Sequence, residues 1–380
     1  MTGGAGDILV LNAGSSSIKF GLFDGQLNQT LSGIAAGIGE QSSLTLNGVT
    51  NQPNLPDHQT ALAEILNALP IPPSRLCAAA HRVVHGGAKL TKPARVSDSI
   101  LQEIKACIPL APLHNPHNLA AITALAKIAP GLPQYVSFDT AFHATNPAVA
   151  TRYAIPKELE SEGIRRYGFH GLSYASLIHH LPNLSGRPLP ARLLAFHLGN
   201  GASLCAIRHG KSIATTMGYS PLDGLTMGTR AGGIDANAVL HLVENHGLER
   251  VKSILNNESG LLGLSGGKSD MRNLMRDKSE QGHFAIEHFC YWSLRYAGSL
   301  ISAMQGLDAI AFTGGIGENA PDIRARIMQG LEWIGVRFDT QANEANAPKL
   351  HSDNSQITTW IVPAKEEHEI AKNALALIHA

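Results

Sequence analysis

The first stretch of the chain with the composition of a phosphate site reads Asn12-Ala13-Gly14-Ser15-Ser16-Ser17-Ile18-Lys19. Small residues let successive backbone amides converge on an anion. Ser15 and Ser17 add hydroxyl donors, and Lys19 adds a positive charge. The stretch therefore predicts a phosphate-binding turn, with an ordinary surface hairpin as the alternative.

Two further glycine-rich segments are candidate nucleotide loops. One is His197-Leu198-Gly199-Asn200-Gly201, and the other is Thr313-Gly314-Gly315-Ile316-Gly317-Glu318-Asn319. The second lies between an expected strand and an expected helix, an arrangement that directs amides and a helix dipole at a ligand. Ordinary turns are the alternative for both. Residues 263–269 look like a P-loop, but the spacing between Gly263 and Gly267 is one residue short, so we reject a Walker-A motif.

Charged residues in apolar or glycine-rich surroundings are candidates for the chemistry itself. Arg82 lies in the segment 81–87 and Arg230 in the segment 227–233. A guanidinium in such a setting suits a carboxylate or a phosphate, although a structural ion pair is the alternative. Asp139 follows an expected strand and is a candidate metal-side carboxylate, with turn capping as its alternative.

Two other segments are candidates for contact with a ligand. His170 differs from most of the 18 histidines because Arg165-Arg166 precede it and Gly171 follows it. The segment Asp270-Met271-Arg272 comes just after the rejected P-loop and is a candidate for nucleotide contact.

Two expected hairpins position the first two glycine-rich turns. Apolar runs at residues 8–11 and 18–23 flank the first turn, and runs at 193–198 and 204–207 flank the second. Both turns join strand to strand, whereas Walker-A and dinucleotide loops open a helix. The hairpins are separated by about half the chain, so we interpret the protein as two domains of one duplicated fold.

The elements between the hairpins alternate between strands and helices, which indicates an α/β fold. We expect strands over residues 78–84, 135–138 and 307–312. Asn115 is predicted to cap a helix that runs to about Ala129, with Pro116 at its first position. Other helices are expected from Asp235 to Gly247 (amphipathic), over 283–305 (long and mostly buried) and from about Pro321.

Composition excludes several classes of function. The 380 residues contain 30 Lys+Arg and 30 Asp+Glu, so there is no basic excess to neutralise nucleic-acid phosphates. No apolar run is long enough for a transmembrane helix, and residues 1–7 lack the features of a secretory signal. The four cysteines show no CxxC spacing, which argues against a cysteine-built zinc site. A cytoplasmic protein is expected.

Several motifs, in order, resemble those of the acetate kinase family. They lie at residues 12–19, 81–87, 111–116, 138–143, 166–171, 197–203, 227–235 and 314–319. The resemblance extends from about residue 8 to residue 371. It implies the duplicated actin/Hsp70/sugar-kinase (ribonuclease H-like) α/β architecture, with the active site in the cleft between domains. It also implies reversible, Mg²⁺- or Mn²⁺-dependent transfer of the ATP γ-phosphoryl group to acetate, giving ADP and acetyl phosphate, by a homodimer.

The resemblance also implies domain boundaries and site residues. The first domain takes residues 1–140 and a returning segment 365–380, and the second, nucleotide-binding and dimer-forming, takes 141–364. The implied catalytic residues are Asp139, His170, Arg230 and, nearby, His114. Those implied to bind the acceptor and its acyl chain are Arg82, Val84, Leu113, Phe169 and Pro221. The implied metal ligands are Asn12 and Glu366. The residues implied to hold phosphate and nucleotide are Lys19, Ser15, Ser17, His197, Leu198, Gly199, Asn200, Gly201, Asp270, Met271, Arg272, Gly315, Ile316, Gly317, Glu318 and Asn319.

Two features of the sequence bear on the expected metal site and on the role of Asp139. The chain reads Ala364-Lys365-Glu366-Glu367 where the family usually reads Thr-Asn-Glu-Glu, so Lys365 adds a positive charge beside the implied metal ligand. Acetate is already ionised near neutral pH and needs no general base when it attacks phosphorus. We therefore hypothesise that Asp139 mainly orients Mg²⁺ or its water.

Three rival functions follow from the same features. A propionate or butyrate kinase would share the mechanism; Val84 favours a two-carbon acid, but one methylene is worth only about 1–3 kcal/mol. A sugar kinase typically has Asp-x-Gly-x-Thr in the first hairpin, where this chain has Asn12-Ala13-Gly14-Ser15-Ser16. An Hsp70- or actin-like nucleotide-gated binding module would need an extension for which the two domains leave no room.

Overall fold

The computed structural model describes residues 6–380, which divide into two compact units. The first unit extends to Ala141 and includes Lys365–Ala380, and the second is Phe142–Ala364. Residues 1–5, which contain most of the segment used to exclude a secretory signal, lie outside the described residues. In the described part, no helix is both long and apolar enough to span a membrane.

The first unit is built on a sheet with strand order β5-β4-β3-β2-β1-β6-β8-β7. β1 pairs antiparallel with β2 and parallel with β6, and β6 pairs parallel with β8. The strands are β1 (Asp7–Ala13), β2 (Ser17–Phe23), β3 (Gln29–Ala36), β4 (Ser43–Leu46), β5 (Val49–Asn51), β6 (Leu76–Val83), β7 (Ala94–Arg95) and β8 (Gln134–Phe138).

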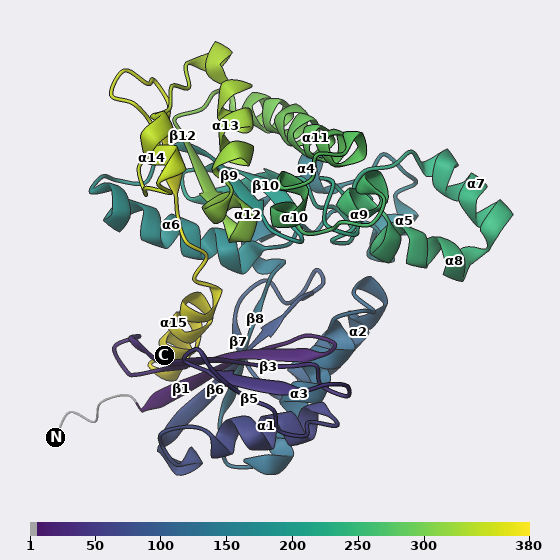
Figure 1. Cartoon of the computed structure of the whole chain (residues 1–380). Helices are drawn as coiled ribbons and strands as arrows, with labels where there is room; N and C mark the ends of the chain where they lie inside the picture. The colour runs from purple at the N-terminus through teal and green to yellow at the C-terminus, as the bar shows by residue number, and fades with distance from the viewer. Residues whose placement is uncertain (1–5) are drawn as a thin grey trace. The chain divides into compact units, whose positions relative to one another are not determined.

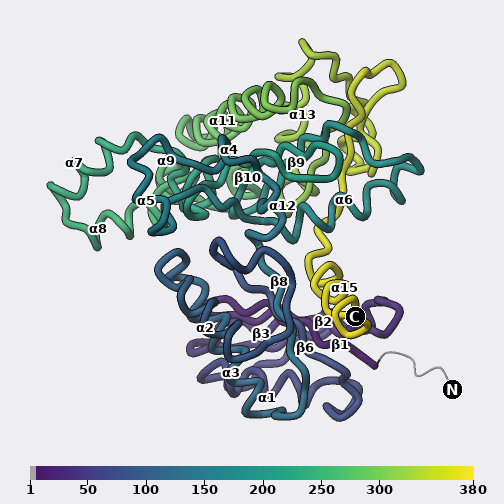
Figure 2. Tube along the Cα trace, turned by 180° about the vertical axis from the view of Figure 1, so that it is seen from behind, coloured from purple at the N-terminus to yellow at the C-terminus, as the bar shows by residue number. Residues whose placement is uncertain are grey.

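Helices cover both faces of this sheet, which explains why β1 reads as a nearly continuous apolar run. Leu9 and Leu11 pack with α1 (His58–Asn67) and α3 (Asn115–Ile128) in one buried core. The C-terminal helix α15 (Glu366–Ile378) contacts β1 and β6, and Figures 1 and 2 show it returning beside the N-terminal strands, on the face opposite α1 and α3. The remaining helices of the unit are α2 (Asp98–Ala106) and the short 3-10 turns Pro73–Arg75 and Ile108–Leu110.

The second unit has a sheet of order β11-β10-β9-β12-β13. Its strands are β9 (Arg192–Leu198), β10 (Ala202–Arg208), β11 (Lys211–Thr215), β12 (Ala309–Thr313) and β13 (Thr358–Ile361). One face packs on α6 (Gly171–Ser185) through Tyr174, Leu177 and Leu181. The long helix α11 (Glu280–Met304) contacts β9, β10 and β11.

The other elements of the second unit connect or flank this sheet (Figure 1). Its remaining helices are α4 (Ala148–Thr151), α5 (Glu158–Ser161), α7 (Ala236–His246), α8 (Leu248–Ser253), α9 (Gly260–Ser265), α10 (Met271–Met275), α12 (Gly314–Asn319), α13 (Pro321–Gln329) and α14 (Thr340–Glu344). Single turns of other helix types occur at Ala141–Thr145, where the two units divide, Ile254–Glu258 and Glu332–Ile334.

The two sheets share a five-strand pattern, which confirms the predicted duplication. In the first unit the order β3-β2-β1-β6-β8 begins with antiparallel pairs and ends with parallel pairs. The order β11-β10-β9-β12-β13 repeats both the succession and the directions. Both glycine-rich turns therefore occupy the same place, the tip of the hairpin beside the first parallel strand.

Three sequence predictions about elements were wrong in part. Asn115 does not cap α3, because the cap position is His114 and the Asn115 side chain turns instead to the main chain of His85. Residues 314–319 are not a loop but the short helix α12, since the Glu318 side chain accepts the Gly314 N–H. The long helix α11 starts at Glu280 and exposes one aromatic face. The prediction for α7 is confirmed: Asp235 caps it, and its half-buried residues Val239, Leu242 and Val243 lie on one face, as in an amphipathic helix.

Candidate active site

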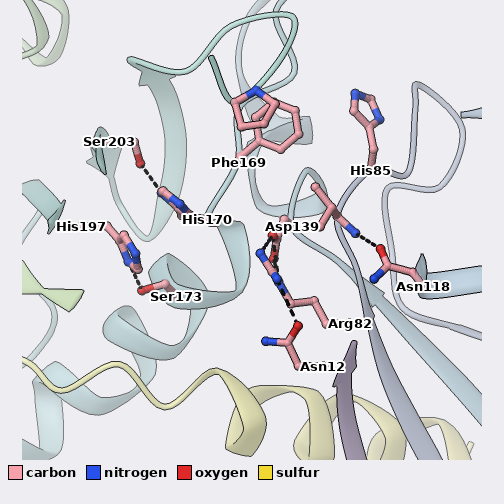
Figure 3. A network of polar contacts seen from close by, with 12 residues as sticks. Asn12, Arg82, His85, Asn118, Asp139, Phe169, His170, Ser173, His197 and Ser203 are labelled. Atoms are coloured by element: carbon pink, nitrogen blue, oxygen red, sulfur yellow. Dashed lines mark hydrogen bonds and ion pairs between the residues drawn. The ribbon is translucent and has the colours of Figure 1, made fainter. Parts of the chain in front are cut away.

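Arg82 and Asp139 form the charged centre of the first unit. Arg82 forms a bidentate ion pair with Asp139. Its Nε lies 3.1 and 3.0 Å from the two carboxylate oxygens, and its Nη2 lies 2.5 Å from Oδ2. Its Nη1 donates to Asn12 Oδ1 at 3.1 Å, and Figure 3 shows these side chains pointing toward one another. Burial opposes the guanidinium charge, but the Asp139 carboxylate outweighs it, and the pKa of Arg82 is raised.

The sheet register explains why these residues meet. Asn12 is opposite Lys19 in the antiparallel β1–β2 pair, so both side chains lie on one face. Leu11 is opposite His81 in the parallel β1–β6 pair, and Val83 is opposite Phe138 in the β6–β8 pair. Asn12 and Arg82 therefore lie near the carboxyl ends of β1 and β6, and Asp139 directly follows β8, so all three meet at the same edge of the sheet.

Glu366 lies close enough to the charged centre of the first unit to be affected by the Arg82 charge. It opens α15 and its carboxylate lies in the field of Arg82 and Lys19, which lower its pKa. Burial is the larger effect and, with the negative charge of Glu367, leaves the pKa of Glu366 raised.

The first glycine-rich turn is held by side chains from two helices. Gly14 N–H donates to Ser17 O at 2.7 Å, which closes the turn, and Ser15 is exposed at its tip. His58 of α1 places Nε2 2.8 Å from Gly14 O, and Asn118 of α3 donates from Nδ2 to Ala13 O at 2.8 Å. The turn is therefore anchored through the consecutive carbonyls of Ala13 and Gly14, its single glycine.

The predicted acyl-pocket residues of the first unit differ in exposure. Val84 directly follows β6 and is buried, with its N–H bonded to Asn118 Oδ1 at 3.1 Å. Leu113 is 56% exposed on the segment before α3, so it does not belong to a formed pocket within this unit. His114 occupies the cap position of α3, where its carbonyl accepts from Asn118 N–H at 3.1 Å.

A stacked histidine pair marks the corresponding place in the second unit. The rings of His170 and His197 lie 4.0 Å apart at an interplanar angle of 26°. His170 Nδ1 is 2.8 Å from Ser203 Oγ, and His197 Nδ1 is 2.8 Å from Ser173 Oγ (Figure 3). Because Ser203 is on β10 and Ser173 is on α6, these bonds fix both rings between the hairpin and the start of α6.

The backbone at His170 has a strained conformation, and contacts from the buried His143 hold the residues before it in place. His170 has φ +58°, a left-handed conformation that costs energy for a residue with a Cβ. The preceding carbonyl, Phe169 O, is 2.9 Å from Nε2 of the buried His143. Gly168 has φ +81°, and a Cβ there would meet the His143 ring. Burial lowers the pKa of His143 to about 4, so the ring that supports this turn is neutral at pH 7.

Arg230 and the second glycine-rich turn meet in the same unit. Arg230 Nη1 donates to Pro221 O at 3.2 Å. A Cβ at Gly201 would lie 3.2 Å from His170 Nε2 and 3.7 Å from Arg230 Nη1, so the glycine allows both side chains to approach. Gly228 N–H donates to Asn200 O at 2.9 Å, which ties the turn to the segment that carries Arg230.

A cavity of about 680 Å³ in the second unit brings three predicted nucleotide segments together. They contribute Gly199 and Asn200, then Asp270, Met271 and Arg272, and then Gly315, Ile316 and Asn319. The volume lies in the range of small-molecule sites. The remaining lining residues, none of them a predicted site residue, are Ser269, Met275, Ala320, Pro321 and Asp322.

Several polar groups of the predicted nucleotide segments, at the cavity or next to it in the chain, are engaged within the protein. Asp270 caps α10, and Arg272 pairs with Asp270 at 2.7 Å in an exposed ion pair. Gly317 is buried, and its carbonyl accepts from the buried Arg324 at 3.0 Å. Glu318 accepts from Gly314 N–H and Ala364 N–H, so its carboxylate holds the loop rather than facing a ligand.

Comparison with known proteins identifies the family. Residues 7–372 match the model of the acetokinase family. The chain belongs to this family. An acetate kinase of Methylocella silvestris is 41% identical over 98% of both chains. The crystal structure of the Porphyromonas gingivalis acetate kinase has a TM-score of 0.90 at 34% identity, covering 98% of this chain and 100% of that one.

A second similar solved structure is named for a different acid, propionate. The propionate kinase of Francisella tularensis has a TM-score of 0.92 at 36% identity, covering 97% of this chain and 98% of that chain. These full-length matches confirm the predicted fold class and the resemblance to the acetokinase family.

The donor set in the first unit of this acetokinase-family chain fits a magnesium ion. Asn12 offers an amide oxygen, Asp139 and Glu366 offer carboxylates, and hard oxygen ligands with retained water suit Mg²⁺. The partly buried Glu366 has a raised pKa, a cost that a nearby cation would relieve. Within residues 6–380 no group of three or more His, Cys, Asp and Glu side chains is placed to hold a metal ion.

Several residues around the site were absent from the sequence prediction. Asn118, His58 and His143 bind main-chain carbonyls of Ala13, Gly14 and Phe169, respectively. Buried polar side chains of this kind are recognisable only once their partners are known. The nearest sequence signal was Asn115-Pro116, which was interpreted as a helix cap.

Proposed function

We propose that this acetokinase-family protein catalyses the reversible, Mg²⁺-dependent transfer of the ATP γ-phosphoryl group to acetate, giving acetyl phosphate and ADP. The observation that carries the proposal is the full-length relationship to proteins named acetate kinases, at 41–42% identity. The arrangement of Arg82 in the first unit and of the nucleotide-sized cavity in the second supports it.

Arg82 binds the acceptor carboxylate. A guanidinium has five N–H donors, of which Asp139 takes those on Nε and one on Nη2, and Asn12 takes one on Nη1. One N–H on each terminal nitrogen is left for a carboxylate, the ligand that this fork recognises best. In the first unit, Val84 would contact the short acyl chain; Phe169 and Pro221 remain the predicted acyl-chain contacts of the second unit.

Asp139 serves as the counter-charge that fixes Arg82, not as a general base. Acetate attacks as a carboxylate and has no proton to lose, since carboxyl pKa values lie near 4. The Asp139 side chain is only 2% exposed and both of its oxygens accept from Arg82. Its second task is to orient the metal or its water.

The other assigned residues bind and stabilise phosphate. Lys19, Ser15 and Ser17 hold phosphate oxygens at the first turn, and Asn12 with Glu366 would hold Mg²⁺ (or Mn²⁺), which neutralises phosphate charge when bound. In the second unit, residues 197–201 and 270–272 bind the nucleotide together with Gly315, Ile316 and Asn319, while Gly317 and Glu318 hold this segment in place. His170 and Arg230, with His114, stabilise the charge that spreads over the transferred phosphoryl group.

Trapping of acyl phosphate with hydroxylamine tests this function. The assay uses ATP and Mg²⁺ with acetate, propionate, butyrate or glycerol as acceptor. We expect the highest kcat/KM with acetate and a fall of roughly 10-fold for each added methylene. A maximum with propionate would favour the second candidate, a propionate kinase, which the likeness to the Francisella protein supports. ATP hydrolysis without any acyl phosphate would contradict both.

We also propose that the protein forms a homodimer through α11. On this helix Phe284 and Tyr291 are 53% and 59% exposed. Trp292 lies on the next turn after His288, and Arg295 covers its ring at 4.7 Å. An exposed aromatic stripe of this kind is typical of an interaction surface.

The double variant Phe284→Glu/Tyr291→Glu tests the homodimer. We expect size-exclusion chromatography with light scattering to give the dimer mass for the unmodified chain and the monomer mass for the variant. Trp333→Glu is the control, because Trp333 is 77% exposed on a separate 3-10 turn of the same unit. A dimeric double variant would show that another surface is used.

A further inference from the structure

Asn118 bridges two segments that the sheet itself does not connect. It lies on α3, is 2% exposed, and uses both ends of its amide. Oδ1 accepts the Val84 N–H at 3.1 Å, and Nδ2 donates to Ala13 O at 2.8 Å. Ala13 adjoins Asn12 at the start of the turn, and Val84 follows Arg82 by two residues.

The bridge is placed where the β1–β6 ladder ends. The last register pair between these strands is Leu11 with His81. Beyond this pair, β1 is paired only with β2, where Ala13 is opposite Ile18. The chain that follows β6 is no longer paired with β1. The amide of Asn118 thus replaces the missing strand-to-strand bonds between the ends of β1 and β6.

We propose that Asn118 is a positioning residue that keeps the phosphate turn in register with the acceptor site. The proposal rests on the function proposed above. There, Lys19 binds phosphate, Asn12 would hold the metal ion, and Arg82 and Val84 bind the acceptor. The Arg82 Nη1 to Asn12 Oδ1 bond of 3.1 Å spans the same gap. Because Ala13 and Val84 are both bound to one amide, the main chain on each side of that bond is held in place.

The chain supplies a matched control in Asn115. It lies one turn earlier on the same helix and is equally buried. Its Oδ1 accepts the His85 N–H at 3.1 Å, and its Nδ2 donates to His85 O and Ile104 O at 3.0 and 3.4 Å. Its bonds go to the segment after β6 and to α2, so they support the fold without joining that segment to the turn.

The decisive variants are Asn118→Asp and Asn115→Asp. Each keeps the Oδ1 acceptor and the size of the side chain but removes the Nδ2 donor, so only Asn118→Asp releases Ala13. We expect Asn118→Asp to lower kcat about 10- to 100-fold, because small misplacements of reacting groups have effects of this size. The KM for acetate stays within about threefold, since the Val84 bond is kept.

Asn118→Ala separates the two bonds. It loses both, so we expect the same fall in kcat together with a rise in acetate KM of about 10-fold. Asn115→Asp should keep kcat within about threefold even where urea denaturation shows a comparable loss of stability. A kcat for Asn118→Asp within threefold of the unmodified enzyme, or an equal loss in Asn115→Asp, would overturn the proposal.

Two further measurements keep the test decisive. If Asn118→Asp does not fold, Asn118→Ser is used in its place, since its short uncharged side chain cannot span both partners, and the same kcat criterion applies. Asn12→Ala and Lys19→Ala test the site itself. If they lose activity while the Asn118 variants do not, only the positioning role fails. If they keep full activity, the assignment of the turn to phosphate fails as well.

Discussion

At the scale of single residues, the site depends on charges that are paired before any substrate binds. Arg82 is held on three of its nitrogens by Asp139 and Asn12, and its side chain is 22% exposed. Removing one partner of such a buried pair typically costs about 3–5 kcal/mol, because the other charge is left uncompensated. The geometry of the guanidinium, rather than its charge alone, is therefore what a substitution should test.

Arg82→Lys keeps the charge but loses the planar fork. A lysine cannot hold Asp139, Asn12 and an acceptor carboxylate at once. We expect kcat/KM for acetate to fall roughly 100-fold or more, measured in the hydroxylamine assay. Arg192→Lys is the control, because Arg192 makes a similar contact with Asp308, at 3.1 and 2.5 Å, on the other sheet. Equal losses in both variants would mean that the assay reports folding rather than the site.

At the scale of elements, the second hairpin depends on its contact with the segment that carries Arg230. The tip residue Asn200 packs directly over Gly228, and the Gly228 N–H bonds to its carbonyl at 2.9 Å. Asn200 also lines the cavity proposed for the nucleotide. The position of the hairpin tip therefore links Arg230 to the nucleotide site within one unit.

Gly228→Ala should move the tip of this hairpin. A Cβ at this position would overlap Oδ1 of Asn200, so either the side chain or the turn must shift. We expect the KM for ATP to rise about 10-fold while acetate KM stays nearly constant. Gly298→Ala in α11 is the matched control, since a Cβ there meets no atom within 4 Å. It should keep both constants and stabilise the helix by about 0.5–1 kcal/mol. Unchanged ATP binding in Gly228→Ala would separate the hairpin tip from the nucleotide site.

At the scale of the whole molecule, buried neutral histidines set the response to acid. Burial lowers the pKa of His81 in the first unit to about 4, and that of His143 in the second unit to about 4. His81 is partly compensated by its bond to Gln134 at 2.7 Å. A group whose pKa is lower in the folded state binds fewer protons there than in the unfolded chain, so acid favours unfolding.

We therefore expect the free energy of unfolding to fall as the pH is lowered from about 6.5 toward 4. Each of these histidines contributes up to about 1.4 kcal/mol per pH unit in this range. Urea denaturation at pH 7.5, 6.0 and 5.0 measures the trend. His81→Gln should flatten it, because glutamine takes up no proton on unfolding, whereas the exposed His246→Gln should leave it unchanged. A pH-independent midpoint for the unmodified protein would contradict this expectation.

The sequence alone determined the features that depend on neighbouring residues. Small residues between apolar runs specify the two hairpins at Gly14 and Gly199, and Asp235 with Gly247 fixes the ends of α7. The same local signals in each half made the duplication recognisable. They also carried the resemblance on which the residue assignments rest.

Only the tertiary structure decided which distant residues share a hydrogen bond. Arg82 and Asp139 were single candidates in the sequence, and the register of β1, β6 and β8 brought them together with Asn12. Asn115 was predicted as a cap because its local pattern fits one, but its amide found buried main-chain partners at His85 instead. The physical reason is that a buried polar group must be satisfied wherever a partner lies. For Asn118 that partner is Ala13, which belongs to a strand far away in the sequence.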